Sequence, residues 1–175
     1  MDANSLRQSF TDVISEDAIL GRSAALQLIQ RERKLDVVRL VRSMVLGAGS
    51  DDSGRLSDAM SYSIQEAPKD GVVRGIFYGW MTENFAELMR FVAGRALDRV
   101  RALPPKLSGS LGGVTDWQVV DSETVTLRAP LAGAFPATST PAGLKIHKRY
   151  SLGRGNIVGY DISPAREHDG PHLVL

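Results

Sequence analysis

Two acidic residues, Asp121 and Glu123, are the clearest candidates for chemistry in this sequence. They lie in the segment 117–127, which alternates with the period of a strand, and both fall on its mostly apolar phase. An unpaired carboxylate is costly to bury, so an acid on that phase needs a metal ion, a cation or partial exposure to solvent. Asp121 is therefore a candidate metal ligand. In the alternative interpretation, 121–124 form a turn between two short strands and both acids lie in water.

A basic run near residue 31 could contact the phosphates of a nucleic acid. Its members are Arg31, Arg33 and Lys34. Arg39 and Arg42 continue the positive charge on the expected outer face of the following helix. Acidic residues interleave with this run, and they leave a solvated helix start as the alternative interpretation.

Residues 57–80 predict two short helices joined by a tight turn, which could form a helix-turn-helix. The second helix would present Arg74 to DNA, and Lys69 would lie at the turn. A plain helical hairpin explains the same pattern, because short helix pairs are common and no local motif here is diagnostic.

Composition limits the classes of function that this 175-residue chain can have. Hydrophobic residues make up 43% of the chain and charged residues 23%, which is typical of a globular protein. Because the net charge is only +1, any DNA binding must come from local patches. The absence of cysteine excludes disulfide scaffolds, thiolate metal sites and cysteine nucleophiles. Neither a membrane span nor a signal peptide is visible, so we expect a cytoplasmic protein with no membrane partner.

The periodicity of apolar residues changes from helical to alternating near residue 104. Helical spacing predicts helices over 17–30, 35–46, 57–66, 72–80 and 82–101, with Thr82 as the N-cap of the last. Alternation predicts strands over 117–127, 144–152 and 156–162, paired antiparallel in that order. We therefore predict an α+β protein with a helical domain over 1–104, a linker rich in proline and glycine over 105–114, and a strand domain over 115–175.

The strand domain is expected to be incomplete. Three strands followed only by a short helix start near Asp169 would leave one face of the sheet uncovered, and an exposed apolar sheet face is unstable.

Several segments, taken in order, resemble a bacterial DDE transposase of the fourth insertion-sequence family. They are residues 31–35, 56–59, 76–82, 85–89, 119–127, 143–147, 159–162 and 167–169. The resemblance implies a helical DNA-binding domain followed by a ribonuclease H-like catalytic domain, of which 115–175 would supply the first three strands.

In that family three carboxylates hold two divalent ions, Mg²⁺ or Mn²⁺, which promote DNA cleavage and strand transfer. Asp121 matches the first carboxylate, and the regions that carry the second and third are not in this sequence. Asp169 matches a His-Asp pair that opens a later helix, so it is not taken for the second acid. Glu123 departs from the family, which usually has threonine or a small residue there.

The resemblance implies insertion-sequence terminal repeats as the DNA partner, self-association as a further partnership, and a location at the bacterial nucleoid. The residues expected to contact DNA are Arg31, Arg33, Lys34, Lys69, Arg74 and Lys145. With one of three carboxylates, we expect that this chain alone does not cut or join DNA, and that any DNA binding resides in residues 1–104. Two alternatives are a non-catalytic DNA-binding or interaction remnant of a decayed transposase, and a helical interaction module with no DNA role.

Overall fold

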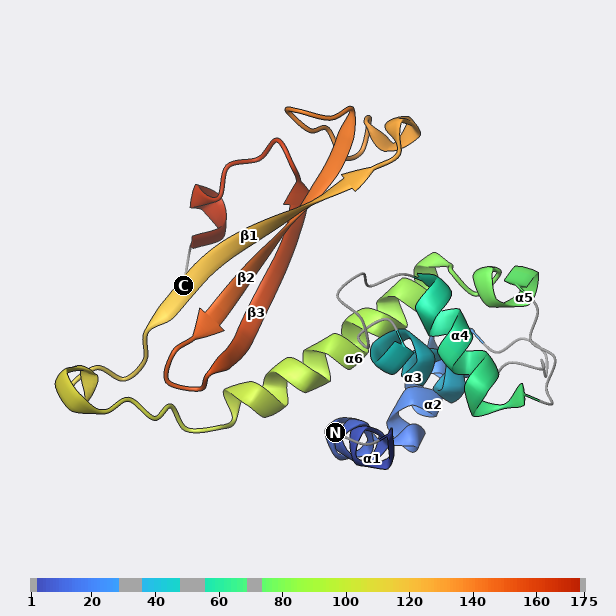
Figure 1. Cartoon of the computed structure of the whole chain (residues 1–175), viewed down its shortest axis with the longest axis horizontal. Coiled ribbons are helices and arrows are strands. Elements are labelled where there is room, and N and C mark those ends of the chain that lie inside the picture. Colours follow the sequence, from blue (N-terminus) through green and yellow to red (C-terminus); the bar gives the residue numbers. More distant parts are fainter. Residues whose placement is uncertain (1–2, 29–35, 48–55, 69–73, 174–175) are drawn as a thin grey trace. The chain divides into compact units, whose positions relative to one another are not determined.

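In the computed structural model, the residues described are 3–28, 36–47, 56–68 and 74–173. They form two compact units that divide between Ala96 and Leu97, inside the long helix α6 (Glu83–Arg101). The first unit is helical and the second contains an antiparallel sheet (Figure 1). This combination agrees with the predicted α+β class. Within the described residues, no helix is both long and apolar enough to cross a membrane.

The helical unit contains α1 (Ala3–Val13), α2 (Glu16–Ala25), α3 (Val37–Arg42), α4 (Leu56–Glu66), α5 (Arg74–Tyr78) and most of α6. Helices α4 and α6 match the predicted ranges closely. Helix α1 was not predicted, although Phe10 within it and Ile14 just after it are both buried. The predicted helix over 35–46 is a short α3 continued by a π-helical turn, Ser43–Gly47.

Side-chain caps determine where two of these helices begin. Asp36 precedes α3, and its Oδ1 accepts a hydrogen bond from the Val38 amide at 2.8 Å. Thr82 precedes α6, and its Oγ1 accepts from the Phe85 amide at 3.3 Å, which confirms the predicted N-cap. Both caps satisfy amides that the first turn of a helix leaves without a partner.

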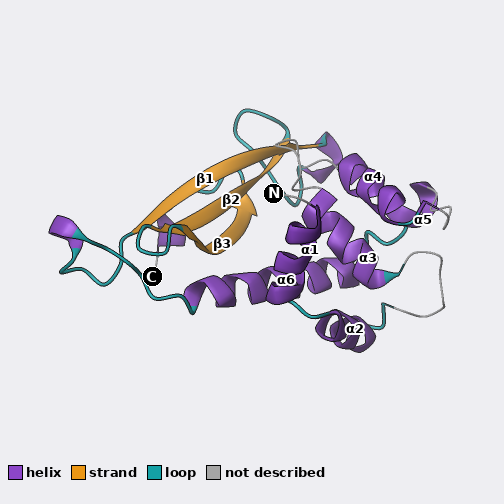
Figure 2. Ribbon diagram, turned by 60° about the horizontal axis from the view of Figure 1, so that its bottom comes forward, coloured by secondary structure: helices purple, strands orange, loops and turns teal. Residues whose placement is uncertain are grey.

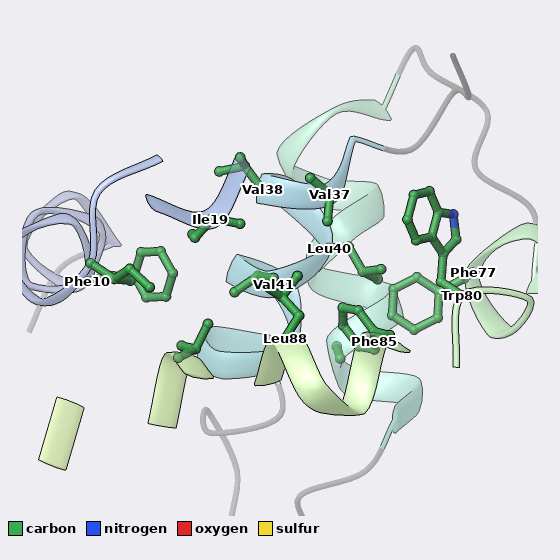
Figure 3. Close-up of a cluster of buried hydrophobic side chains, with 13 residues drawn as sticks. Phe10, Ile19, Val37, Val38, Leu40, Val41, Phe77, Trp80, Phe85 and Leu88 are labelled. Carbon is green, nitrogen blue, oxygen red and sulfur yellow. The ribbon is translucent and has the colours of Figure 1, made fainter. Parts of the chain in front are cut away.

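The core of the helical unit is a cluster of aliphatic and aromatic side chains (Figure 3). Ile19 of α2, Leu40 of α3 and Leu88 of α6 are all fully buried there. Gly47 lets α4 approach closely, because a Cβ at this position would lie 2.7 Å from the Cα of Ala59. Gly47 thus closes the π-helical turn against α4 at a point where a side chain would not fit.

The sheet of the second unit consists of β1 (Gln118–Leu127), β2 (Ala142–Ser151) and β3 (Asn156–Pro164), antiparallel in the order β1-β2-β3 (Figure 2). This topology confirms the predicted strands and their pairing. Asp121 lies opposite Lys148, and His147 lies opposite Asp161. The register shifts where Arg149 pairs with Gly159 and Tyr150 pairs with Ile157, which leaves Val158 as an extra residue in a β-bulge.

Asp116 ties the start of β1 to the hairpin between β2 and β3. Its Oδ2 accepts hydrogen bonds from Ser151 Oγ at 2.7 Å and from Arg154 Nη1 at 2.6 Å. Its Oδ1 accepts from the Gly153 amide at 3.0 Å. These interactions, that from Ser151 above all, hold the pKa of the Asp116 carboxyl below its usual value. The carboxylate therefore joins segments that are distant in the sequence.

We predict that Leu88→Ala lowers the free energy of unfolding by about 2–5 kcal/mol, because it leaves a cavity in the helical core. The matched control is Leu20→Ala, which removes the same atoms from a side chain that is 41% exposed on α2. We expect the control to cost about 1 kcal/mol or less. Urea unfolding followed by circular dichroism measures both values, and equal losses would contradict the assigned core.

We predict that Asp116→Asn destabilises the strand unit at neutral pH and that the effect fades in acid. The pKa of Asp116 is lower in the folded than in the unfolded chain, so its carboxylate stabilises the fold above about pH 3.9. That stabilisation is lost as the pH falls through the folded-state pKa. Calorimetric melting of wild type and variant from pH 7 to about pH 2 measures the difference.

Asp121→Asn is the matched control for this experiment, because Asp121 is exposed on the same sheet. Its melting temperature should follow that of the wild type at every pH. A deficit of Asp116→Asn that stays constant into acid would refute the role given to the Asp116 charge.

Candidate functional site

Asp121 lies in the middle of β1, and its side chain is exposed. Strand β1 runs without interruption from Gln118 to Leu127, so the alternative of a turn over 121–124 is wrong. Asp121 and Glu123 therefore share one face of the sheet, as the alternation predicts. The Asp121 Oδ1 accepts a hydrogen bond from the Ser122 amide at 2.9 Å. Exposure to solvent explains how a carboxylate is tolerated on this phase of the strand.

The neighbouring carboxylate, Glu123, forms an ion pair with Lys148 on β2. The hydrogen bond from the Lys148 ammonium lowers the pKa of Glu123. Lys148 lies directly opposite Asp121 in the register but reaches diagonally to Glu123. Glu123, unlike Asp121, is therefore paired with a cation among the described residues.

The residues around Asp121 do not fit a site for two metal ions. Such a site needs several carboxylates that converge on ions about 3.5–4 Å apart. Among the described residues, no group of three or more His, Asp or Glu side chains is placed to hold a metal. Glu123 is engaged by Lys148, and Asp169 contacts residues of the opposite face, Lys145 and His147.

The opposite face of the sheet carries a buried polar network. His147 is 2% exposed, and its Nε2 lies 2.9 Å from Ser163 Oγ. Its Nδ1 lies 3.3 Å from Asp169 Oδ1, and the same oxygen lies 3.2 Å from Lys145 Nζ. The hydrogen bond from Lys145 is the main cause that lowers the pKa of the Asp169 carboxyl. The network holds the segment after β3 against β2.

Ser163, His147 and Asp169 occur in the order of a catalytic triad, with the histidine between a hydroxyl and a carboxylate. A nucleophilic serine must meet its substrate, and Ser163 is only 4% exposed within β3. Its hydroxyl also lies 3.3 Å from the carbonyl oxygen of Pro164, to which it donates. We interpret the three residues as a structural network and not as a hydrolase site.

Lys145 is one of the predicted DNA contacts, and the structure gives it partners within the chain. Its Nζ donates to the Glu167 carbonyl at 2.8 Å as well as contacting Asp169, and its side chain is 15% exposed. Contact of Lys145 with DNA stays a prediction. To make that contact, the ammonium group would have to leave Glu167 and Asp169.

The other predicted DNA contacts lie mostly outside the described residues. This holds for Arg31, Arg33, Lys34 and Lys69. Arg74 is described: it is exposed at the start of α5, and its guanidinium lies 5.5 Å from the ring centroid of Tyr78. An exposed cation stacked on an aromatic ring is available to a phosphate.

The expectation that Arg39 and Arg42 face solvent is wrong. Arg39 is 7% exposed. Arg42 forms ion pairs with Glu66 at 2.6 Å and with Glu16 at 2.8 Å. Carboxylates from α2 and α4 thus neutralise Arg42, which links these two helices to α3.

Sequence reasoning did not select Arg101, Arg149 and Arg154, which line one pocket of the second unit. They lie in three different segments of the sequence. One feature of the sequence could have pointed to Arg149: it shares a strand phase with Lys145 and His147.

The chain matches no protein-family model, and no curated protein or solved structure is significantly similar to it.

Proposed function

We propose that this chain is a DNA-binding part of a DDE transposase related to the fourth insertion-sequence family. The observation that carries the proposal is the position of Asp121, exposed in the middle of the first strand of the three-stranded antiparallel sheet. A ribonuclease H-like domain begins with such strands and carries its first catalytic acid there. In this proposal, the helical unit that precedes the sheet is the DNA-binding domain.

The proposed partner is DNA that carries insertion-sequence terminal repeats. The proposed contacts are the basic residues near 31, together with Lys69 and Arg74. A helix-turn-helix over 57–80 belongs to this proposal and is supported by α4 and α5, while 69–73 between them lie outside the described residues. Arg39 is buried and Arg42 is paired with Glu66, so neither is among the proposed phosphate contacts.

A DNA-binding role without cleavage is the form of this function that the strand unit supports best. Asp121 has no second free carboxylate beside it on the described sheet, because Lys148 neutralises Glu123. Two-metal phosphoryl transfer needs more than one such ligand. The chain would recognise DNA ends, and Mg²⁺ or Mn²⁺ chemistry would require further carboxylates.

A helical interaction module with no DNA role is the competing function. An electrophoretic mobility shift with terminal-repeat DNA separates the two. Absence of any shift by the intact chain at low salt would reject the proposed function and favour the interaction module.

We predict that replacing Arg31, Arg33 and Lys34 together by alanine weakens DNA binding and its dependence on salt. For each phosphate that the variant no longer neutralises, the slope of log K against log salt should become shallower by about 0.9. Fluorescence anisotropy over a series of salt concentrations measures affinity and slope. Arg90→Ala is the control, because that exposed arginine is paired with Glu87. Unchanged affinity and slope in the triple variant would contradict this assignment.

We predict that the purified chain does not cut or join terminal-repeat DNA in the presence of Mg²⁺ or Mn²⁺. The physical reason is the shortage of carboxylates around Asp121 among the described residues. A strand-nicking assay on linear duplex, with Asp121→Ala in parallel, measures this. Turnover by the wild type that disappears in Asp121→Ala would overturn the prediction and show that the metal site is completed in another way.

A further inference from the structure

A pocket of about 200 Å³ in the second unit is lined by Arg101, Arg149 and Arg154, together with Gln118 and Val158. Arg101 ends α6, Arg149 lies on β2, and Arg154 belongs to the turn between β2 and β3. Guanidinium groups repel one another, so three of them around one small cavity need carboxylates or a bound anion to compensate.

Two of the three arginines have acidic partners. Arg154 Nη1 lies 2.6 Å from Asp116 Oδ2, and this pair is largely buried. Arg101 Nη1 lies 3.7 Å from Asp98 Oδ1, in a pair that is mostly exposed. No ion-pair partner of Arg149 is found among the described residues. The pocket therefore retains positive charge, which is centred on Arg149.

Backbone contacts fix two of the guanidinium groups. Arg101 Nε donates to the carbonyl of Val158 at 2.7 Å, at the β-bulge. Arg154 Nε donates to the carbonyl of Leu103 at 2.9 Å. A guanidinium has five N–H donors, so each of these side chains keeps others for a ligand. The cavity walls are thus held in place before any ligand binds.

The glycine opposite Arg149 makes room for its guanidinium. Arg149 pairs with Gly159 across β2 and β3. A Cβ on Gly159 would lie 2.7 Å from Nη2 and 2.8 Å from Nε of Arg149. The guanidinium therefore occupies the space that a side chain at 159 would need, so a larger residue there would displace it.

We propose that this pocket binds a single phosphate group through Arg149, with Arg101, Arg154 and the amide of Gln118 as further donors. Planar guanidinium groups match phosphate oxygens, often with two parallel hydrogen bonds. The cavity is smaller than the roughly 300 Å³ at which pockets for drug-sized ligands begin, so it suits one phosphate rather than a whole nucleotide. The phosphate comes either from a DNA backbone or from a small free anion.

Phosphate binding by this pocket does not depend on the proposed transposase function. The identification of a DNA phosphate as the natural ligand does rest on that function. If the helical unit fails to bind DNA, the pocket still binds free phosphate. If the pocket fails, DNA binding by the basic residues near 31 is unaffected. The two proposals therefore fail separately.

The test uses the intact chain and two variants of the pocket. Arg149→Gln removes the charge, and Gly159→Ala keeps the charge but displaces the guanidinium. Arg128→Gln is the matched control, because Arg128 is exposed on the same unit and does not line the pocket. Circular dichroism verifies that each variant is folded. If Arg149→Gln does not fold, Gly159→Ala alone tests whether the pocket binds phosphate.

Isothermal titration with inorganic phosphate in chloride buffer is the first arm. We expect saturable binding by the wild type and by Arg128→Gln, and binding about tenfold or more weaker in both pocket variants. A duplex oligonucleotide is the second arm. A salt slope that is shallower by about 0.9 in Arg149→Gln but not in Arg128→Gln assigns the ligand to the DNA backbone.

Reduced phosphate binding with an unchanged duplex slope supports the site with a free anion as its ligand. The proposal is overturned if neither phosphate, titrated to about 10 mM, nor duplex DNA shows binding that depends on both Arg149 and Gly159. Equal losses in the pocket variants and in Arg128→Gln also overturn it, because they indicate only a general effect of charge.

Discussion

The carboxylate of Asp116 holds the register on which the candidate sites of the strand unit depend. It collects donors from Ser151, Gly153 and Arg154, so it joins the start of β1 to the hairpin that follows β2. A shift of one residue between β1 and β2 would turn every side chain of the moved strand to the other face. Asp121 would then change faces relative to β2. The same carboxylate orients Arg154 at the pocket, so hairpin and pocket share one anchor.

The two faces of the sheet have different chemistry because of this register. One face is exposed, and it presents Asp121 and the Glu123–Lys148 pair among apolar side chains such as Val119 and Ile162. The other face buries His147 and Ser163. Ser163 Oγ lies 2.9 Å from His147 Nε2, and Asp169 Oδ1 lies 3.3 Å from His147 Nδ1, so the buried groups have polar neighbours. The exposed face thus carries Asp121 and the Glu123–Lys148 pair, and the other face carries the buried contact between His147 and Ser163.

Several basic side chains that the sequence suggested as DNA contacts instead form ion pairs within the protein. Arg42 connects Glu16 of α2 with Glu66 of α4, and Lys145 holds the segment after β3. A charge that is paired and partly buried cannot meet a phosphate without losing its partner, and breaking such a pair is costly. Among the described residues, Arg74 and Arg149 are examples of arginines without such an ion-pair partner.

The sequence by itself determined the kinds of element and their order. Alternation around Asp121 and the spacing of apolar residues in 82–101 are local patterns, and local patterns report which face of a strand or helix is apolar. They therefore predicted the α+β class, the antiparallel strands and the Thr82 cap, all of which the structure contains. They did not predict the π-helical turn Ser43–Gly47 that continues α3 or its close approach to α4 at Gly47, which is a tertiary contact.

Only the tertiary structure decided which charged groups meet. Arg101, Arg149 and Arg154 reach one pocket through the end of a helix, a strand and a turn, and no spacing in the sequence encodes that convergence. Glu123 is neutralised by Lys148 through the strand register, and Arg39 is buried by the packing of helices. Charge pairing acts over a few ångströms in space, whereas sequence periodicity reports only the orientation of each side chain on its own element.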